Sequence, residues 1–193
     1  MEATVAEART LLARAFVDDP LMVWFFPDDE SRLHACAALF GLFAEHYLAV
    51  GRVDVRRRDH LAGVAMWRLP DTAPAGAPES LPTTSGLMTA LIGSRRAAQL
   101  ERAFSAVAEM RPPGPHAYLH FLAVDPDLQG RGIGGRVLEP GLTAAWENGL
   151  VACLETTNPD NIPFYESHGF VVRHELRLEA DGPRIWELTA APY

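Results

Sequence analysis

Cysteine, basic charge and long apolar runs are all scarce in this chain. Its two cysteines lie far apart, and neither belongs to a C-x-x-C pair or to a Cys/His ligand spacing, which predicts no disulfide framework and no metal site. Glu45 and His46 interrupt the best apolar stretch before it reaches the roughly 20 residues of a membrane span. Glu2 and Glu7 stand where a signal peptide would be basic. The sequence therefore predicts a cytoplasmic protein without a membrane partner.

Acidic residues outnumber basic ones and give a formal net charge of -8. This balance argues against nucleic acid as a partner and mildly favours a cationic small substrate. The 193 residues, 48% of them apolar and 22% charged, match an ordinary globular protein. They suffice to bury a core without disulfide or metal support, so residues 1–193 are predicted to form one domain.

Apolar periodicity predicts an α/β chain. Helices are expected over 5–16, 31–50, one or two within 87–110, and 134–148, and strands over 52–57, 61–69, 118–124, 151–157, 170–178 and 184–189. Residues 21–26 form an apolar connector, and 70–82, rich in Pro, Ala and Gly, form an exposed loop. The strand, helix, strand order over 118–157 predicts a parallel crossover.

The segment from Leu119 to Gly135 constrains function most. An apolar strand leads through an acidic-proline turn to Gly130, Gly132, Gly134 and Gly135, and a helix follows. Glycine lets backbone N–H groups come close to a ligand, and the first turn of a helix leaves its N–H groups unpaired at a partly positive end. The segment therefore predicts a site for a phosphate or pyrophosphate.

One interpretation of this turn is a dinucleotide site. Gly130, Gly132 and Gly135 satisfy G-x-G-x-x-G, and Glu155, 20 residues after Gly135, stands where such a fold places its ribose-binding acid. Against this interpretation, residues 125–129 separate the strand from the first glycine, and only two further strands follow Glu155. An NAD-binding oxidoreductase of the Rossmann type stays open as an alternative.

Two motifs resemble those of the GCN5-related N-acetyltransferase (GNAT) superfamily. Residues 129–134, Q-G-R-G-I-G, match its Q/R-x-x-G-x-G/A signature, and residues 165–170, Y-E-S-H-G-F, match its Y-x-x-x-G-F segment. The two stand in the right order and about thirty residues apart, as the intervening helix and strand require. Residues 154–156, 161–166 and 182–186 resemble the corresponding segments of puromycin N-acetyltransferase and its relatives.

The resemblance implies a mixed, strongly twisted sheet that splays open beside the glycine turn, with helices on both faces. It also implies acetyl-CoA as the co-substrate. Main-chain groups of Leu122, Ala123 and Val124 would pair with the pantetheine arm as an added strand would. The pyrophosphate would lie on the amides of Gln129, Gly130, Arg131, Gly132, Ile133, Gly134 and Gly135. Asn158 or Asn161 would bond the same arm.

The superfamily fold normally begins with a strand, and this sequence departs from that pattern. Here Thr4 already lies at the start of the first helix, so the first strand is expected to be absent. An uncovered sheet edge invites pairing, which leaves monomer and homodimer both open.

The reaction implied by the resemblance is direct attack of a neutral amine on the thioester, without an acyl-enzyme. A backbone N–H near Ala123 or Val124 would stabilise the tetrahedral oxyanion. Tyr165 stands at the position of the superfamily's general acid, which protonates the departing thiolate.

The general base is open between two nearer residues and two more distant ones. His120 is expected to share a strand face with Tyr118 and Leu122 and so to point into the cleft, where an imidazole can take a proton near neutrality. Equally, His120 could be a structural residue that packs on the strand with its N–H group hydrogen-bonded. Glu155, at the end of the next strand, would either take the proton through a water molecule or be a purely structural carboxylate. Asp19 and Glu45 are the more distant candidates for the base, and the solvated surface is the default expectation for both.

The acceptor is expected to be the primary amine of a small molecule, such as an antibiotic or another amphiphilic amine. By the resemblance, the first two helices, their connector and the late strands form its pocket, and aromatic walls suit such an amine. The aromatic residues this selects are Trp24, Phe25, Tyr47, Trp67 and Trp186. A non-catalytic acyl-CoA sensor would keep the same motifs and is the second alternative.

Overall fold

The computed structural model describes residues 2–72 and 83–192. Its elements run in the order α1 (Val5–Phe16), α2 (Pro20–Phe25), α3 (Asp29–Val50), β1 (Arg52–Arg57), β2 (Leu61–Arg68), α4 (Thr84–Ile92), α5 (Ser94–Met110), β3 (His116–Val124), α6 (Ile133–Glu147), β4 (Val151–Thr156), α7 (Ile162–Glu166), β5 (Val171–Arg177) and β6 (Arg184–Ala190). Short 3-10 turns, Pro126–Leu128 and Pro159–Asn161, precede α6 and α7. The predicted helices and strands are confirmed to within a few residues at their ends. Most of the loop predicted over 70–82 lies outside the described residues.

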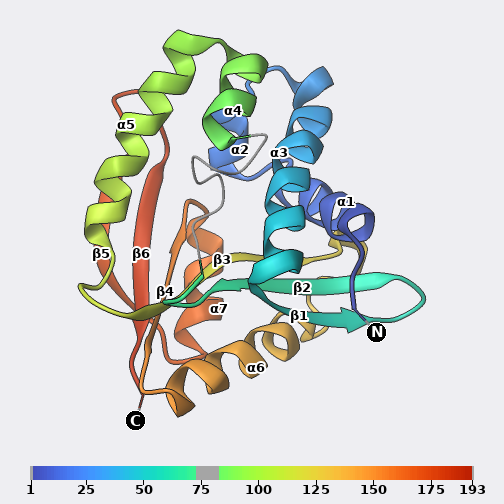
Figure 1. Cartoon of the computed structure of the whole chain (residues 1–193), viewed down its shortest axis with the longest axis vertical. Helices are drawn as coiled ribbons and strands as arrows, with labels where there is room; N and C mark the ends of the chain where they lie inside the picture. Colours follow the sequence, from blue (N-terminus) through green and yellow to red (C-terminus); the bar gives the residue numbers. More distant parts are fainter. Residues whose placement is uncertain (1, 73–82, 193) are drawn as a thin grey trace.

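The strands form one mixed sheet in the order β1-β2-β3-β4-β6-β5. Of its strand pairs, β3 with β4 is parallel, as the crossover predicted, and the other four are antiparallel. Figure 1 shows the strong twist, with β1 and β2 running across the view while β6 stands nearly upright. Helix α6 packs on one face of the sheet, and α1 and α3 pack on the other. The predicted mixed, twisted sheet with helices on both faces is confirmed.

The sheet splits between its two parallel strands. β3 and β4 pair only where residues 116–118 face residues 151–153. Beyond that point β3 stays bonded to β2 as far as Val124, and β4 stays bonded to β6 as far as Thr156. The facing edges of the two strands therefore lie apart, and main-chain groups on the open edge of β3 are left for another partner.

A β-bulge in β3 changes which side chains share a face. Met66 faces Phe121 and Trp67 faces Leu119, so His120 is the extra residue. The rings of His120 and Phe121 therefore stack on the α3 side with their centroids 3.9 Å apart, whereas Leu122 packs in the cluster beneath α6. The expectation that His120 and Leu122 share a face was wrong, because it assumed unbroken alternation along the strand.

Capping residues fix where helices α1 and α2 begin, and the corner between these helices borders the split. Thr4 caps α1, and its side chain accepts the Glu7 N–H while the Glu7 carboxylate accepts the Thr4 N–H. Asp19 caps α2, and Pro20 fills the first helical position. The segment expected to be a simple apolar connector is therefore the short helix α2. Among the described residues, no strand precedes α1.

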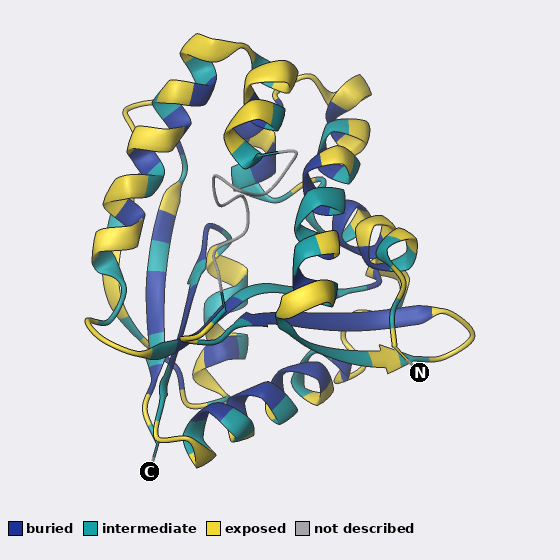
Figure 2. Cartoon of the chain, in the orientation of Figure 1, coloured by how far each residue is buried: buried dark blue, intermediate teal, exposed yellow. Residues whose placement is uncertain are grey.

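Two apolar clusters lie on opposite faces of the sheet. Strand β2 separates them and is buried along its length except at its last residue (Figure 2). Trp67 has no exposed surface and packs so closely beneath α6 that a Cβ on Gly141 would lie 2.1 Å from its Nε1. Cys36 and Cys153 are free and buried, and burial raises the pKa of the Cys36 thiol to about 11.

In the part of the chain that the structure describes, α3 is the one helix that length and composition would allow to cross a membrane. Its side chains Cys36, Leu39, Phe40, Ala44 and Tyr47 are buried in the core, and α1 and the first two strands pack against it. Packing within the fold accounts for the apolar side chains on its buried face.

Candidate active site

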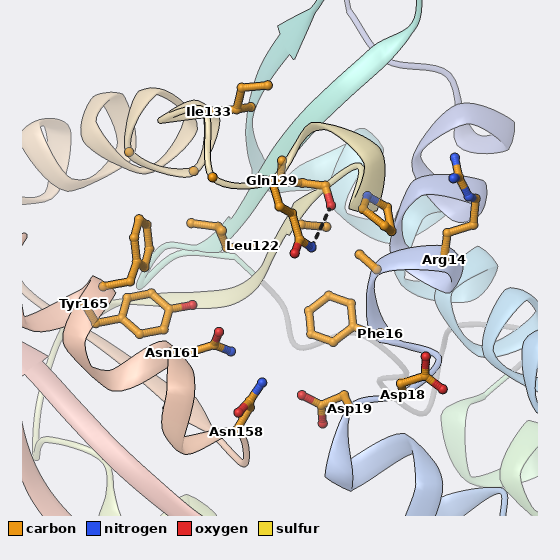
Figure 3. A pocket seen from close by; sticks show the side chains of 18 of the residues that line it. Arg14, Phe16, Asp18, Asp19, Leu122, Gln129, Ile133, Asn158, Asn161 and Tyr165 are labelled. Atoms are coloured by element: carbon orange, nitrogen blue, oxygen red, sulfur yellow. Dashed lines mark hydrogen bonds between the residues drawn. The ribbon is translucent and has the colours of Figure 1, made fainter.

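A cavity of about 680 Å³ opens at the split in the sheet. Its lining comes from the α1–α2 corner, the end of β3, the glycine turn with the start of α6, and the segment around α7 (Figure 3). Four stretches far apart in the sequence therefore meet at one space.

The glycine turn presents free amides to this cavity. Gly130 and Gly132 have φ angles of 72° and 68°, a left-handed conformation that glycine adopts without strain. Gly132 is the N-cap residue of α6, and no side chain caps that end of the helix. The N–H groups of residues 133–135 are thus open to a ligand at the positive end of the helix dipole. The arrangement fits an anionic group such as a pyrophosphate.

Ion pairs fasten the start of this turn to α1. Arg14 bonds Asp125 at 3.1 Å and Asp127 at 3.0 Å, and His60 bonds the same Asp125 oxygen at 2.9 Å. Asp125 also accepts the Asp127 N–H, which closes the turn after β3. The sequence predicted the acidic-proline turn but did not reveal Arg14, since nothing in α1 marks one arginine among others.

Almost every residue predicted to hold acetyl-CoA lines the cavity. Leu122, Ala123 and Val124 line it from the open edge of β3, and Asn158 and Asn161 both line it from the opposite side. The residues of the turn that line it are Gln129, Gly130, Gly132, Ile133, Gly134 and Gly135. The exception is the side chain of Arg131, which is exposed and donates to the Asp127 carbonyl instead.

The two asparagines differ in their remaining hydrogen-bonding capacity. Asn158 Oδ1 accepts the Asp160 N–H at 3.0 Å, so its amide N–H groups stay available. Asn161 Nδ2 donates to Thr156 Oγ1 at 3.4 Å, so its carbonyl oxygen stays available. One can donate to a ligand amide carbonyl and the other can accept from a ligand N–H.

Tyr165 comes from α7 and is 8% exposed. Phe164 and Phe170 hold its ring at centroid distances of 5.1 and 5.7 Å, and its hydroxyl points into the cavity (Figure 3). Burial first, and then the negative charge of Asp19, raise the pKa of this hydroxyl above its usual value. Tyr165 therefore keeps its proton at neutral pH and can donate it.

The two nearer base candidates, His120 and Glu155, lie outside the cavity lining, whereas Asp19 lines it. His120 Nδ1 is hydrogen-bonded to Tyr47 Oη at 2.8 Å, and burial and nearby arginines hold the pKa of the imidazole well below its usual value. Glu155 accepts from Arg111 at 2.6 Å and from the Tyr118 hydroxyl at 2.6 Å, with 6% of its side chain exposed. Both side chains belong to a buried polar network beside the cavity.

The aromatic residues predicted to bind the acceptor are packed elsewhere, and none of the five lines the cavity. Trp67 lies in the core beneath α6, and Tyr47 is 1% exposed. Arg96 covers the Trp24 ring at 4.5 Å, Phe25 packs on Phe104, and Trp186 Nε1 donates to Glu175. The aromatic residue of α1 that does line the cavity is Phe16, which sequence reasoning treated only as part of the helix pattern.

The architecture and the cavity agree with a family comparison. Residues 13–170 match the family described as Acetyltransferase (GNAT) family. The chain belongs to the GNAT acetyltransferase family. It is thus an acetyl-CoA-dependent N-acetyltransferase, and the predicted superfamily is confirmed. This match excludes the alternative of a Rossmann-type dinucleotide-binding fold. The sheet supports the exclusion, because only one pair of the described strands is parallel.

Solved structures of other GNAT proteins show the same fold. A Corynebacterium glutamicum protein described as histone acetyltransferase HPA2 and related acetyltransferase superposes with a TM-score of 0.74 at 25% identity, over 100% of this chain and 95% of that one. A GNAT-family protein of Desulfovibrio desulfuricans gives 0.52 at 18% identity, over 98% and 96%. A GCN5-related N-acetyltransferase of Rhodopseudomonas palustris gives 0.53 at 13% identity, over 96% and 90%.

A buried carboxyl group next to the Glu155 network makes the stability of this acetyltransferase depend on pH. Glu187 of β6 faces Glu155 across the strand pair and is 1% exposed. Neither of its carboxyl oxygens bonds any described residue. Burial and the charge of Glu155 raise the pKa of Glu187 from 4.5 to about 7.

We expect Glu187→Gln to stabilise the protein above pH 7 relative to the wild type. The unfolded chain releases the Glu187 proton near its ordinary pKa of 4.5, whereas the folded protein holds it up to about 7. Wild-type stability is therefore full below pH 4.5 and is lost as pH rises through 7, by about 2–3 kcal/mol. Urea unfolding of both proteins at pH 5 and pH 8 measures this, and a difference that does not change with pH would contradict it.

Proposed function

We propose that this enzyme transfers the acetyl group of acetyl-CoA directly to the primary amine of a small molecule. The observation that carries the proposal is one cavity that combines uncapped amides, an open strand edge and a buried tyrosine hydroxyl. An anion site, a strand-like docking edge and a proton donor are what transfer from a pantetheine thioester requires.

Each part of the cavity has a role in the proposal. The amides of the glycine turn bind the pyrophosphate, and the open edge of β3 pairs with the pantetheine arm, which supplies the activated acetyl group. A main-chain N–H near Ala123 or Val124 donates to the carbonyl oxygen as negative charge develops there. Tyr165 donates its proton to the departing sulfur. The transfer does not pass through a cysteine, because Cys36 and Cys153 are buried and neither lines the cavity.

The lining of the cavity supports a cationic acceptor. Asp18 and Asp19 border it at the α1–α2 corner, next to the ring of Phe16. Carboxylates beside an aromatic ring suit an amphiphilic amine. The cavity wall therefore fits a small amine better than an anionic or purely apolar acceptor.

Thermal melting with acetyl-CoA, CoA, NAD and NADP in parallel tests the donor, because a ligand that binds the native state raises the melting temperature. A thiol-release assay with puromycin, phenethylamine, spermidine and phenylhydrazine then tests the acceptor. We expect a shift of several degrees with acetyl-CoA and none with NAD. Binding of acetyl-CoA without release of thiol for any amine would favour an acyl-CoA sensor and contradict the proposal.

A further inference from the structure

We propose that Asp19 binds the acceptor ammonium group and takes the proton that its nitrogen must lose before attack. This proposal rests on the proposed function and deepens it, because it names the group that prepares the nucleophile. The substrate class that follows is an aliphatic primary amine, which carries its proton at neutral pH. From the sequence alone, Asp19 was a more distant candidate for the base, with the solvated surface as its default position.

The carboxylate of Asp19 is built into the cavity wall. It lines the same space as Tyr165, from the opposite side (Figure 3). Asp19 Oδ1 accepts two hydrogen bonds, from Thr157 Oγ1 at 2.7 Å and from the Leu21 N–H at 2.9 Å. Oδ2 accepts none from the described residues. One oxygen fixes the carboxylate, and the other remains able to accept from a ligand.

The surroundings of Asp19 favour proton uptake. Burial raises its pKa above the usual value for an aspartate, although the bonds from Thr157 and Leu21 act in the opposite direction. Desolvation also lowers the pKa of a bound ammonium group and so brings the two values closer, whereas the attraction between the two charges acts in the opposite direction. The negative charge of Asp19 also raises the pKa of the Tyr165 hydroxyl. The proton acceptor and the proton donor therefore lie within electrostatic reach of each other.

The protons balance over one turnover. Asp19 Oδ2 accepts one proton from the ammonium group, and the freed lone pair forms the bond to the acetyl carbon. As the carbon–sulfur bond breaks, the Tyr165 hydroxyl protonates the sulfur. The second proton leaves the new amide nitrogen for the Tyr165 oxygen, and Asp19 releases its own to solvent. The ammonium group loses two protons overall, of which one stays on the thiol and one enters solution.

Other candidates for this role are less suitable. His120 and Glu155 do not line the cavity, and Glu155 is already paired with Arg111. Asp18 does line it, but its side chain is 93% exposed and lies 4.0 Å from Arg32. The titratable and charged groups around Asp19 are Arg14 and Asp18 in the lining, Arg32 and Cys36 of α3, and Tyr165 of α7. Asp19 is the half-buried carboxylate among the described lining residues.

Asp19→Asn tests the proposal, and Asp28→Asn is the matched control, because Asp28 holds the N-cap position of α3, is exposed and does not line the cavity. Asparagine caps a helix as well as aspartate does, so α2 is expected to form and the melting shift with acetyl-CoA to persist. With the protonated panel amine that the wild type acetylates fastest, we expect kcat/KM of Asp19→Asn at pH 7 to fall about 100-fold. Asp28→Asn should stay within about threefold of the wild-type value, as a screened surface charge would.

Two further readouts separate proton removal from a structural role. The rate of Asp19→Asn should rise about tenfold per pH unit between pH 6 and 8, since only free amine reacts, whereas the wild-type rate should be flatter. Phenylhydrazine is already neutral at pH 7 and should be acetylated by Asp19→Asn within about threefold of the wild-type rate. An Asp19→Asn enzyme with the wild-type rate and pH profile would overturn the Asp19 role alone. A wild type that binds acetyl-CoA but acetylates no amine would overturn the proposed function as well.

Discussion

Replacing Tyr165 by phenylalanine is expected to lower kcat about 100-fold or more while acetyl-CoA affinity changes by less than about threefold. The substitution removes one hydroxyl and leaves the ring packed between Phe164 and Phe170. That hydroxyl makes no hydrogen bond to any described residue, so its loss leaves no partner unsatisfied. Steady-state kinetics with the best amine of the panel and melting shifts with acetyl-CoA measure the two quantities.

Tyr118→Phe is the matched control for this substitution. Tyr118 is also a buried tyrosine, but its hydroxyl donates to Glu155 and it does not line the cavity. We expect Tyr118→Phe to lower stability by about 1–2 kcal/mol, because it removes a bond to a carboxylate, with kcat reduced far less. Equal losses of kcat in the two variants would argue that Tyr165 only supports the fold.

Replacing Gly132 by aspartate is expected to weaken acetyl-CoA binding about 100-fold. Aspartate tolerates the left-handed backbone better than most residues, so we expect the turn to keep its backbone conformation. Its carboxylate would then stand at the uncapped start of α6, where the proposed function places the pyrophosphate. Two like charges in contact oppose binding by several kcal/mol. Isothermal titration with acetyl-CoA measures the change.

Gly149→Asp provides the control at the other end of the same helix. Gly149 follows α6 and has the same φ of 68° as Gly132, and a Cβ there would meet no atom within 4 Å. Both variants therefore carry the same backbone strain of about 1 kcal/mol, but only Gly132→Asp places charge in the cavity. If both lost acetyl-CoA binding equally, strain in α6 would be the cause and the anion site would lie elsewhere.

Local sequence patterns determined the helices, the strands and the glycine turn. The capping box at Thr4 and Glu7, the apolar periodicity of α1 and α3, and the glycines before α6 act over a few residues. Such short-range effects depend only on neighbouring residues, so they can be predicted from the sequence. For the same reason the turn residues predicted to hold acetyl-CoA do line the cavity, apart from the Arg131 side chain.

The tertiary structure decided which side chains reach the cavity. One extra residue in β3 moves His120 onto the α3 side, where Tyr47 binds it, and Arg111, distant in sequence, pairs with Glu155. Asp19, in contrast, enters the cavity wall because Thr157 meets it there from far along the chain. Bulges and long-range pairings depend on how strands register and pack, and no local pattern encodes them. The sequence by itself determined the family, the fold and the position of the glycine turn, whereas the set of side chains that line the cavity came from the packing of separate segments.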